Sequence, residues 1–219
     1  MTDRPILFSG PMVLEILPGR KTQTRRVIRP QFMSQVSEVR INASGEWCGY
    51  ASGEPGIRRG WRRCPYGAAG NNLWCRETSI IAPQRWNDGA GANCIDAEGV
   101  PRLVRYLATD PDTEAARGYG LRIRPSIHMP RWASRLTLEV TGVRVERVQA
   151  ISGADVLAEG VGQPWNGRGI EAAGGMTDEF EAQLRDRFRM VWDSINGKRP
   201  GCSWEANPWV WVVSFRRLP

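Results

Sequence analysis

The sequence predicts a mixed, mainly β fold with two or three packed helices. Two segments indicate this most clearly. PWVWVVSFRR, residues 208–217, carries β-branched or aromatic side chains at almost every position, which is typical of a strand buried on both faces. LTLEVTGVRVERVQ, residues 136–149, alternates apolar and polar residues and contains Gly142, which predicts a half-buried hairpin or a bent strand. With 219 residues and no internal repeat, the chain is expected to form one elaborated domain over residues 1–219.

The N-terminal segment predicts a strand, a helix and a second strand. Residues 6–8 are apolar, and Ser9 followed by Pro11 is typical of a helix start, so a helix is expected to run to about Leu17. Pro18 and Gly19 end that helix. The residues at 24–28 are again typical of a strand.

The middle of the chain predicts two strands separated by loop-rich sequence. Residues 42–72 are rich in Gly, Arg and Trp and predict a long, loop-heavy insertion. A convincing strand follows at 73–81, and an alternating strand pattern returns at 102–108, after a Gly, Asn and Asp rich stretch over 83–101.

Two helices are expected in the last third. Ser152 is a suitable N-cap for a short helix through Ala158, with Gly160 closing it. Thr177 caps a longer helix that ends at Gly197. Its apolar face comprises Phe180, Leu184, Phe188, Val191, Trp192 and Ile195.

Composition narrows the function classes. The formal charge of +7 suits an anionic or nucleic-acid partner, although an arginine-rich genome gives the same balance. Five cysteines without a CxxC pair argue against a disulfide framework and favour reduced thiols. The apolar stretch 6–17 contains Glu15 and Pro11, so it is neither a signal sequence nor a membrane span. We therefore expect a soluble, cytoplasmic protein with no membrane partner.

Several reaction types are disfavoured. The single histidine, His128, leaves no histidine-based metal cage and is interpreted as a loop or packing residue. A site built from Cys48, Cys64, Cys75 and Cys94 has irregular spacing and is also disfavoured. No P-loop, dinucleotide-binding or serine-hydrolase motif is present, so neither a cofactor nor a metal is expected.

Lys21, within GRKTQTRR at 19–26, is one of two lysines in a chain with 28 arginines. Arginine stays protonated, whereas a lysine amine approaches neutrality when it is desolvated beside other cations. Arg25 and Arg26 lie close in sequence, and Thr24 offers a hydroxyl, so a lysine base or nucleophile is one interpretation. The other, favoured by residue statistics alone, is a solvated cation at a helix end.

Other candidates are weaker taken one at a time. Glu77, in LWCRET, would ordinarily be a solvated or ion-paired strand residue. Glu159 follows the short helix, where a carboxylate opposes the helix dipole unless its end is exposed or a site requires it. Five tryptophans among arginines or glycines could stack on bases, but core or loop anchoring is the commoner role: Trp74, Trp132, Trp165, Trp209 and Trp211.

Five segments together resemble the activating-signal-cointegrator homology (ASCH) family, especially its larger phage and prophage members. They are RPILFSGPMVLEILPGRKTQTRRVI, NNLWCRE, SIHMPRWASRLTLEV, ISGADVLAEG and NPWVWVVSFRR. The resemblance covers nearly the whole chain and implies a PUA-like β-barrel with a cleft lined by the GxKTxTxR motif. It also implies insertions at about 31–69 and 83–134. Arg25 departs from the usual apolar residue of the motif, which leaves the substrate range open.

Small bacterial members of that family are amidohydrolases that remove the acetyl group from N4-acetylcytidine. The resemblance places their catalytic lysine and threonine at Lys21 and Thr24, and their glutamate at Glu159, ahead of Glu77. It thus implies an N4-acylcytidine amidohydrolase acting on a small-molecule N4-acylated cytosine or cytidine. Candidate substrate-binding residues are Arg26, Glu77, Trp74, Phe8 and Trp132.

The mechanism expected from these residues is that neutral Lys21 takes the Thr24 proton while Glu159 orients the amine or protonates the departing base. Burial and neighbouring arginines would lower the Lys21 pKa, and an ionised Glu159 would raise it. Two alternatives stay open: a non-catalytic module that binds RNA or modified nucleotides, and a metal-independent ribonuclease, also found in the family. The sequence leaves the oligomeric state undetermined.

Overall fold

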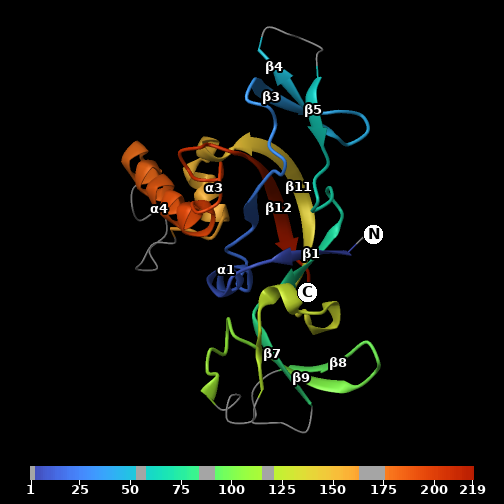
Figure 1. Cartoon of the computed structure of the whole chain (residues 1–219). Helices are drawn as coiled ribbons and strands as arrows, with labels where there is room; N and C mark the ends of the chain where they lie inside the picture. Colours follow the sequence, from blue (N-terminus) through green and yellow to red (C-terminus); the bar gives the residue numbers. More distant parts are fainter. Residues whose placement is uncertain (1–2, 53–57, 84–91, 115–120, 163–175) are drawn as a thin grey trace. The chain divides into compact units, whose positions relative to one another are not determined.

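The computed structural model describes residues 3–52, 58–83, 92–114, 121–162 and 176–219 (Figure 1). The predicted mainly β character is confirmed: these residues form three sheets, and none of the three closes into a barrel within this part of the chain. The described residues divide into two compact units. Unit 1 is Met1–Gly19, Gly70–Glu139 and Arg216–Pro219, and unit 2 is Arg20–Ala69 and Val140–Phe215. The single-domain organisation stays a prediction.

Unit 1 begins with the predicted strand and helix. β1 (Asp3–Leu7) pairs in parallel with β6 (Asn72–Arg76). α1 (Gly10–Ile16) starts after Ser9 with a proline in its first turn, as predicted, because a proline there needs no hydrogen-bond partner for its nitrogen. The backbone of Gly19 has φ of 79°, a conformation that ends the segment after the helix and favours glycine.

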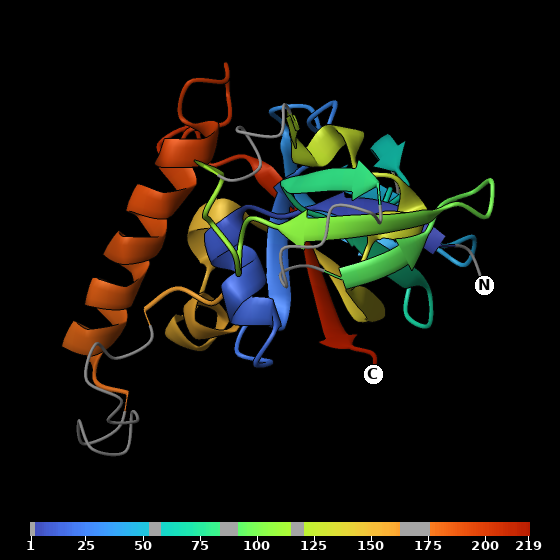
Figure 2. The same ribbon diagram turned by 90° about the horizontal axis from the view of Figure 1, so that it is seen from below.

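The strand predicted at 73–81 is two strands. β6 ends at Arg76, and β7 (Ser79–Pro83) starts a different, four-stranded antiparallel sheet in the order β10-β7-β9-β8 (Figures 1 and 2). The division reflects different partners, since β6 pairs with β1 and β11 while β7 pairs with β9 and β10. The other strands of the small sheet are β8 (Ala92–Ile95), β9 (Pro101–Tyr106) and β10 (Ile123–Arg124).

Two apolar clusters pack in unit 1 around this small sheet. Ile80, Ala82 and Leu103 form one, and the other comprises Val104, Tyr106, Met129 and Ala133. Two short 3-10 helices, Ser126–His128 and Arg131–Ala133, follow β10; Met129 directly follows the first, and Ala133 ends the second.

The large sheet has five strands in the order β1-β6-β11-β12-β2. β11 (Thr137–Arg147) is one continuous strand of 11 residues, so Gly142 does not create a hairpin. β12 (Trp209–Arg217) is buried from Trp209 to Val213, as predicted, and pairs antiparallel with β2 (Gln23–Val27).

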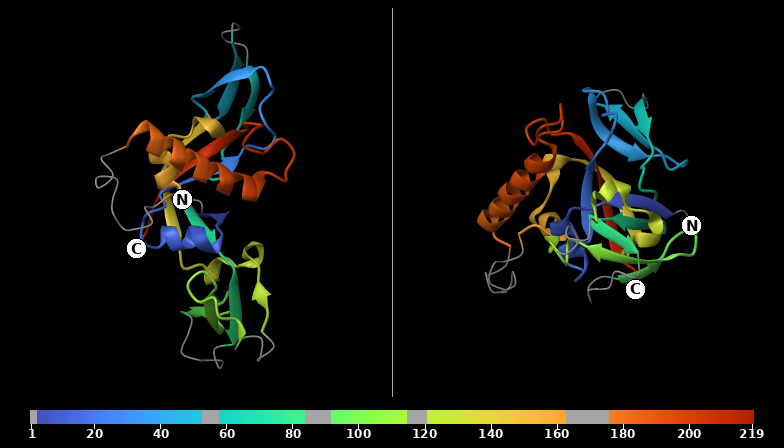
Figure 3. Two further views of the ribbon diagram at one scale, coloured as in Figure 1. Left: turned by 90° about the vertical axis from the view of Figure 1, so that its left-hand side faces the viewer. Right: turned by 60° about the horizontal axis from the view of Figure 1, so that its bottom comes forward.

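The prediction of a loop-heavy segment at 42–72 is wrong over two stretches. β4 (Trp47–Ala51) and β5 (Arg58–Arg62) join β3 (Val36–Ile41) in a three-stranded antiparallel sheet of unit 2 (Figure 3). The glycines that suggested loops have packing and turn roles here. A Cβ at Gly49 would lie 2.8 Å from a Val36 methyl group.

Both helices predicted in the last third are confirmed. α3 (Gly153–Ala158) begins where Ser152 Oγ accepts a hydrogen bond from the Asp155 N–H at 3.2 Å, and Gly160 has φ of 74° just beyond its end. A 3-10 turn, Val148–Ala150, precedes it. α4 (Asp178–Asn196) is capped by Thr177 Oγ1 and packs beside α3 (Figures 1 and 3).

The expected apolar face of α4 is correct at its centre and wrong at its end. Ile195 is 45% exposed, and Asn196 is buried instead. Leu184, Phe188 and Trp192 recur every four residues, and four residues turn a helix by more than one full rotation, so the contact line drifts around the helix toward Asn196. The core of unit 2 comprises Val148, Ile151, Val156, Leu184, Phe188, Trp192, Val210 and Val212.

All five cysteines are thiols. Among the helices of the described residues, none is both long and apolar enough to cross a membrane.

Candidate active site

Lys21 lies in a short irregular segment that two backbone hydrogen bonds hold in place. The Thr22 N–H donates to the Ala158 carbonyl at the end of α3 at 2.9 Å, and the Thr22 carbonyl accepts from the Phe215 N–H of β12 at 2.8 Å. This segment follows α1 and precedes β2, so Lys21 belongs to neither element. Its side chain is buried, with 2% of the residue exposed, so the solvated-cation interpretation of Lys21 is wrong.

The Lys21 amine contacts two oxygens of one residue, Glu159. Nζ donates to the Glu159 backbone carbonyl at 2.7 Å and to its carboxylate oxygen Oε2 at 2.8 Å. Glu159 is the C-cap of α3, and its side chain is only 5% exposed. The carbonyl end of a helix carries partial negative charge, so a buried carboxylate is unfavourable there without a cation. Lys21 supplies that cation, and the structure thus brings together two of the predicted catalytic residues.

Arg25 has central contacts in the site that the sequence did not predict. Its side chain is completely buried. Nη2 contacts Asp155 Oδ2 at 2.8 Å and Glu146 Oε2 at 3.0 Å, while Nη1 lies 3.4 Å from Glu159 Oε1. One feature in the sequence signals this role: Asp155 and Glu159 lie four residues apart, so their carboxylates project from one face of a short helix.

A second layer of contacts holds Asp155 in place. Arg144 Nη2 donates to Asp155 at 2.8 Å, and Gln23 Nε2 donates to Asp155 Oδ1 at 3.1 Å. Partial burial alone would raise the Asp155 pKa, but hydrogen bonds from Arg25, Arg144 and Gln23 outweigh burial, and the pKa is lowered. Asp155 is therefore held as a carboxylate.

Burial is the largest influence on Lys21 and lowers the pKa of its amine below the ordinary 10.5. The charge of Glu159 and the hydrogen bond to it act in the opposite direction, while the nearby Arg26 and Arg25 cations lower the pKa further. The balance that the sequence left open therefore lowers the pKa of the amine. Around Lys21, the ion pairs of Arg25 and Arg144 involve three carboxylates, those of Glu146, Asp155 and Glu159.

Thr24 lies in β2 opposite Val213 of β12 and is 2% exposed. Side chains alternate along a strand, so Thr24 and Arg26 face the side opposite to Gln23 and Arg25. Lys21 precedes the strand, and its Nζ contacts the same Glu159 carboxylate as Arg25 Nη1, so the amine lies on the side that Arg25 faces. The alternation therefore directs the Thr24 side chain to the other side of β2, which is an edge strand of its sheet.

The remaining predicted residues belong to unit 1. Glu77 is buried and forms a two-pronged pair with Arg135, at 2.8 Å to Nε and 2.9 Å to Nη2. Arg135 also lies over the Tyr106 ring, 4.1 Å from its centre. This matches the ordinary reading of Glu77 as an ion-paired residue, and a substrate-binding role for it stays a prediction.

The aromatic candidates have varied environments. The Trp74 ring has Arg76 at 5.3 Å and Arg131 at 5.9 Å, and Phe8 is buried. Trp132 is half-buried, whereas Trp209 and Trp211 are core residues, as predicted for most tryptophans. Trp165 lies outside the described residues, and His128 is exposed in a 3-10 helix.

Comparison of this chain with family models, curated proteins and solved structures found no match.

Proposed function

We propose that this protein is an amidohydrolase of the ASCH type that removes the acyl group from N4-acylated cytosine nucleosides. One observation carries the proposal. A lysine amine in an arginine-dominated chain is almost completely buried, has a lowered pKa and donates to a carboxylate 2.8 Å away. A desolvated lysine with a lowered pKa is suited to accept a proton at a lower pH than an ordinary lysine does.

In the first half of the reaction, Lys21 Nζ takes the proton of the Thr24 hydroxyl. The Thr24 oxygen then forms a bond to the acyl carbon, and the bond between that carbon and N4 breaks. The proton held by the Lys21 and Glu159 pair passes to N4, so the cytosine leaves with its amino group complete. This step requires the Thr24 hydroxyl and the Lys21 amine to meet at the edge of β2.

In the second half, a water molecule gives a proton to Lys21 and attacks the Thr24 ester. The bond between the acyl carbon and the Thr24 oxygen breaks, Lys21 returns the proton to that oxygen, and the carboxylic acid leaves. Arg26 is assigned to the negative charge that develops on the carbonyl oxygen, because a guanidinium is a strong, permanently charged donor. Arg25 has another task, since its contacts to Asp155 and Glu159 keep the carboxylates in place.

The test is hydrolysis of a panel of N4-acylated cytosines, cytidines and deoxycytidines by the purified chain, followed by release of the free base or nucleoside. Removing the amine in Lys21→Met is expected to lower kcat/KM by at least about 100-fold. Thr24→Val, which removes the hydroxyl at nearly constant volume, should be as damaging, and Thr24→Ser should retain most activity.

Thr22 provides the matched control, because it is exposed and lies two residues from Thr24. Thr22→Val should leave the rate unchanged. Retention of full activity in Thr24→Val would remove the threonine nucleophile, and the absence of hydrolysis across the whole panel in wild-type protein would overturn the proposed reaction.

A further inference from the structure

A second candidate ligand site lies entirely within unit 1, on the small sheet. A cavity of about 270 Å³ is lined by Ile81 of β7, Arg102 of β9, Arg124 of β10, Asp96 and Glu98 of the turn between β8 and β9, and Trp132. Typical ligand pockets start at about 300 Å³, so this volume suits one ring-bearing group with a small substituent rather than an extended chain.

One wall of the cavity is preorganised by Asp96. Its Oδ1 accepts from the Val100 and Glu98 backbone N–H groups at 2.7 and 3.1 Å, and its Oδ2 accepts from Arg102 Nε at 2.8 Å. The hydrogen bond from Arg102 is the main reason that the Asp96 pKa is lowered. This turn is therefore held in one shape, and Asp96 is committed to the protein rather than to a ligand.

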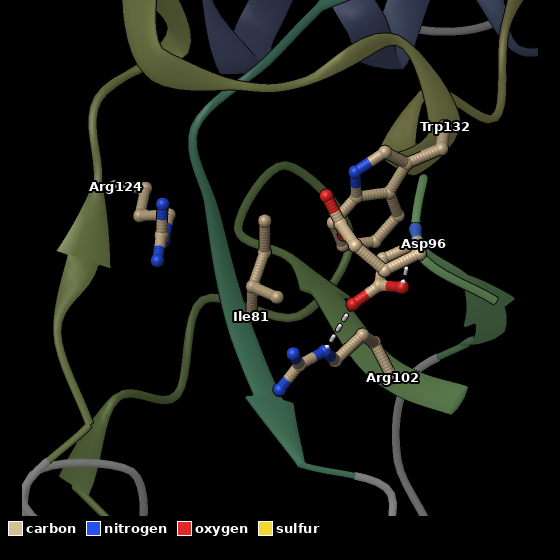
Figure 4. Close-up of a pocket in the computed structure, with 6 residues that line it drawn as sticks. Ile81, Asp96, Arg102, Arg124 and Trp132 are labelled. Carbon is tan, nitrogen blue, oxygen red and sulfur yellow. Dashed lines mark hydrogen bonds and ion pairs between the residues drawn. The ribbon is translucent and has the colours of Figure 1, made fainter. Parts of the chain in front are cut away.

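Another wall is the indole of Trp132. Its neighbour Ala133 is fixed, since the Ala133 carbonyl accepts a hydrogen bond from the buried Tyr106 hydroxyl at 3.0 Å. Trp132 packs against the same apolar cluster and remains half-buried, so part of its ring faces the cavity. Figure 4 shows Trp132 and Arg124 on opposite sides of Ile81. An aromatic face beside an aliphatic side chain is a suitable surface for a planar ring.

The charges that remain available on the rim are those of Arg124 and Glu98. Both side chains are exposed, and within the described part of the chain neither forms an ion pair. Arg102 uses Nε for Asp96, which leaves its terminal nitrogens able to donate. A guanidinium binds phosphate oxygens through paired, charge-assisted hydrogen bonds, and a carboxylate accepts from amino or hydroxyl groups.

We infer that this cavity binds a nucleotide, with the base stacked on Trp132 and the phosphate held by Arg124. Glu98 is placed to accept from an amino group of the base or a hydroxyl of the sugar. The Trp132 ring favours a planar ligand group, and Arg124 favours an anionic one. A nucleotide contains both groups in one small molecule. This site is distinct from the cluster around Lys21, and it does not depend on the proposed deacylation.

Calorimetric titration of the full chain with cytidine monophosphate, cytidine and inorganic phosphate tests this inference. The monophosphate should bind at least about tenfold more tightly than either partial ligand, because only it engages both the ring surface and the guanidinium. Arg124→Ala should reduce its affinity to that of cytidine. Arg122→Ala is the matched control, since Arg122 is exposed two residues away and does not line the cavity, and it should change the affinity less than about twofold.

The aromatic wall is tested by Trp132→Ala, with Trp132→Phe as the variant that keeps a ring. The first should lose binding and the second should retain most of it, while Trp61→Ala, at a tryptophan 57% exposed in unit 2, should have no effect. Circular dichroism checks that each variant is folded. Equal losses in Arg122→Ala and Arg124→Ala would show general charge attraction only and would overturn the site.

Lys21→Met separates this site from the proposed active site. It should abolish deacylation and leave nucleotide affinity unchanged. Loss of affinity in Lys21→Met with none in Arg124→Ala would place the nucleotide elsewhere and overturn the inference. A further titration with tetracytidylate shows whether the ligand is a free nucleotide or one within a strand. If tetracytidylate binds at least about tenfold more tightly than the monophosphate, with the same dependence on Arg124, the ligand is a nucleotide within a strand. If the two bind equally, the ligand is a free nucleotide.

Discussion

Two ion pairs, each with a buried carboxylate, differ in whether their cation can lose a proton. In unit 1, Glu77 is held by both prongs of the Arg135 guanidinium at 2.8 and 2.9 Å. In unit 2, Glu159 shares its two oxygens between the Lys21 amine and the Arg25 guanidinium. Arginine cannot release its proton at ordinary pH, so the first pair has no cation that can lose a proton, whereas the second contains one.

The comparison also explains why this chain retains a lysine. An arginine at position 21 would preserve the positive charge at the end of α3, but it would remove the only titratable cation of the cluster. The lowered pKa of Lys21 is the physical reason that the choice matters.

The largest expected effect comes from replacing the Lys21 amine by a guanidinium. Lys21→Arg retains the charge and should lower kcat/KM by at least about 100-fold, because the guanidinium does not accept the Thr24 proton. The measurement is N4-acetylcytidine hydrolysis under kcat/KM conditions. Lys198→Arg is the matched control, since Lys198 is the other lysine and is exposed. Full activity in Lys21→Arg would end the proposal of amine chemistry.

The next prediction concerns the ion pair between Glu77 and Arg135 in unit 1. Glu77→Gln should lower the free energy of unfolding by about 3 kcal/mol, because Arg135 loses its buried partner. Urea denaturation measures this. Glu139→Gln is the control: Glu139 pairs with Arg216, whose side chain is 68% exposed, so its change should stay below about 1 kcal/mol. A large rise in KM for Glu77→Gln without loss of stability would instead favour substrate binding by Glu77.

Arg25 is expected to position the site rather than react. Arg25→Met should lower kcat by about tenfold, since Glu159 and Asp155 lose a shared donor. It should also move the rising limb of the pH profile to higher pH, because the Arg25 charge lowers the Lys21 pKa. Arg25→Lys should restore part of the rate. Arg189→Met, at an exposed arginine of α4, should alter neither quantity, and an unshifted pH profile in Arg25→Met would refute the positioning role.

The smallest effect is the shape of the wild-type pH profile. Only the neutral amine accepts a proton, so kcat/KM should rise as pH increases through the Lys21 pKa, with its midpoint below 10.5.

A separate prediction concerns the stability of the fold, which should decrease as pH falls into the acid range. The lowered pKa of Asp155 contributes stability that is present above its ordinary value of 3.8 and is lost as pH falls through the lower, folded-state value. Thermal unfolding as a function of pH, compared with Asp155→Asn, checks this contribution.

Local patterns were sufficient to predict the elements that short-range chemistry determines. Ser152 and Thr177 mark helix starts because a side-chain oxygen caps the first turn, and the continuous apolar run before Arg216 marks a buried strand. Residues 47–51 and 58–62 were misassigned because pairing between strands is nonlocal. Gly49 is a close-packing residue, and its packing against Val36 is invisible in sequence spacing.

The site was predictable only in part for the same reason. Lys21 stood out through composition, and Glu159 through the resemblance. The role of Arg25 depends on contacts to residues 121 to 134 positions away in sequence, which no local pattern contains. The Asp96 turn and the Trp132 wall likewise belong to different elements, and their common cavity appears only in the fold.

The double contact between Lys21 and Glu159 has a practical consequence for mutagenesis. One of the two acceptors is a main-chain oxygen, 2.7 Å from Nζ, which every substitution at position 159 leaves in place. Glu159→Gln and Glu159→Ala should therefore keep the lysine tethered while its ionic partner is removed, so that rate changes in these variants measure the effect of the carboxylate rather than a displaced amine.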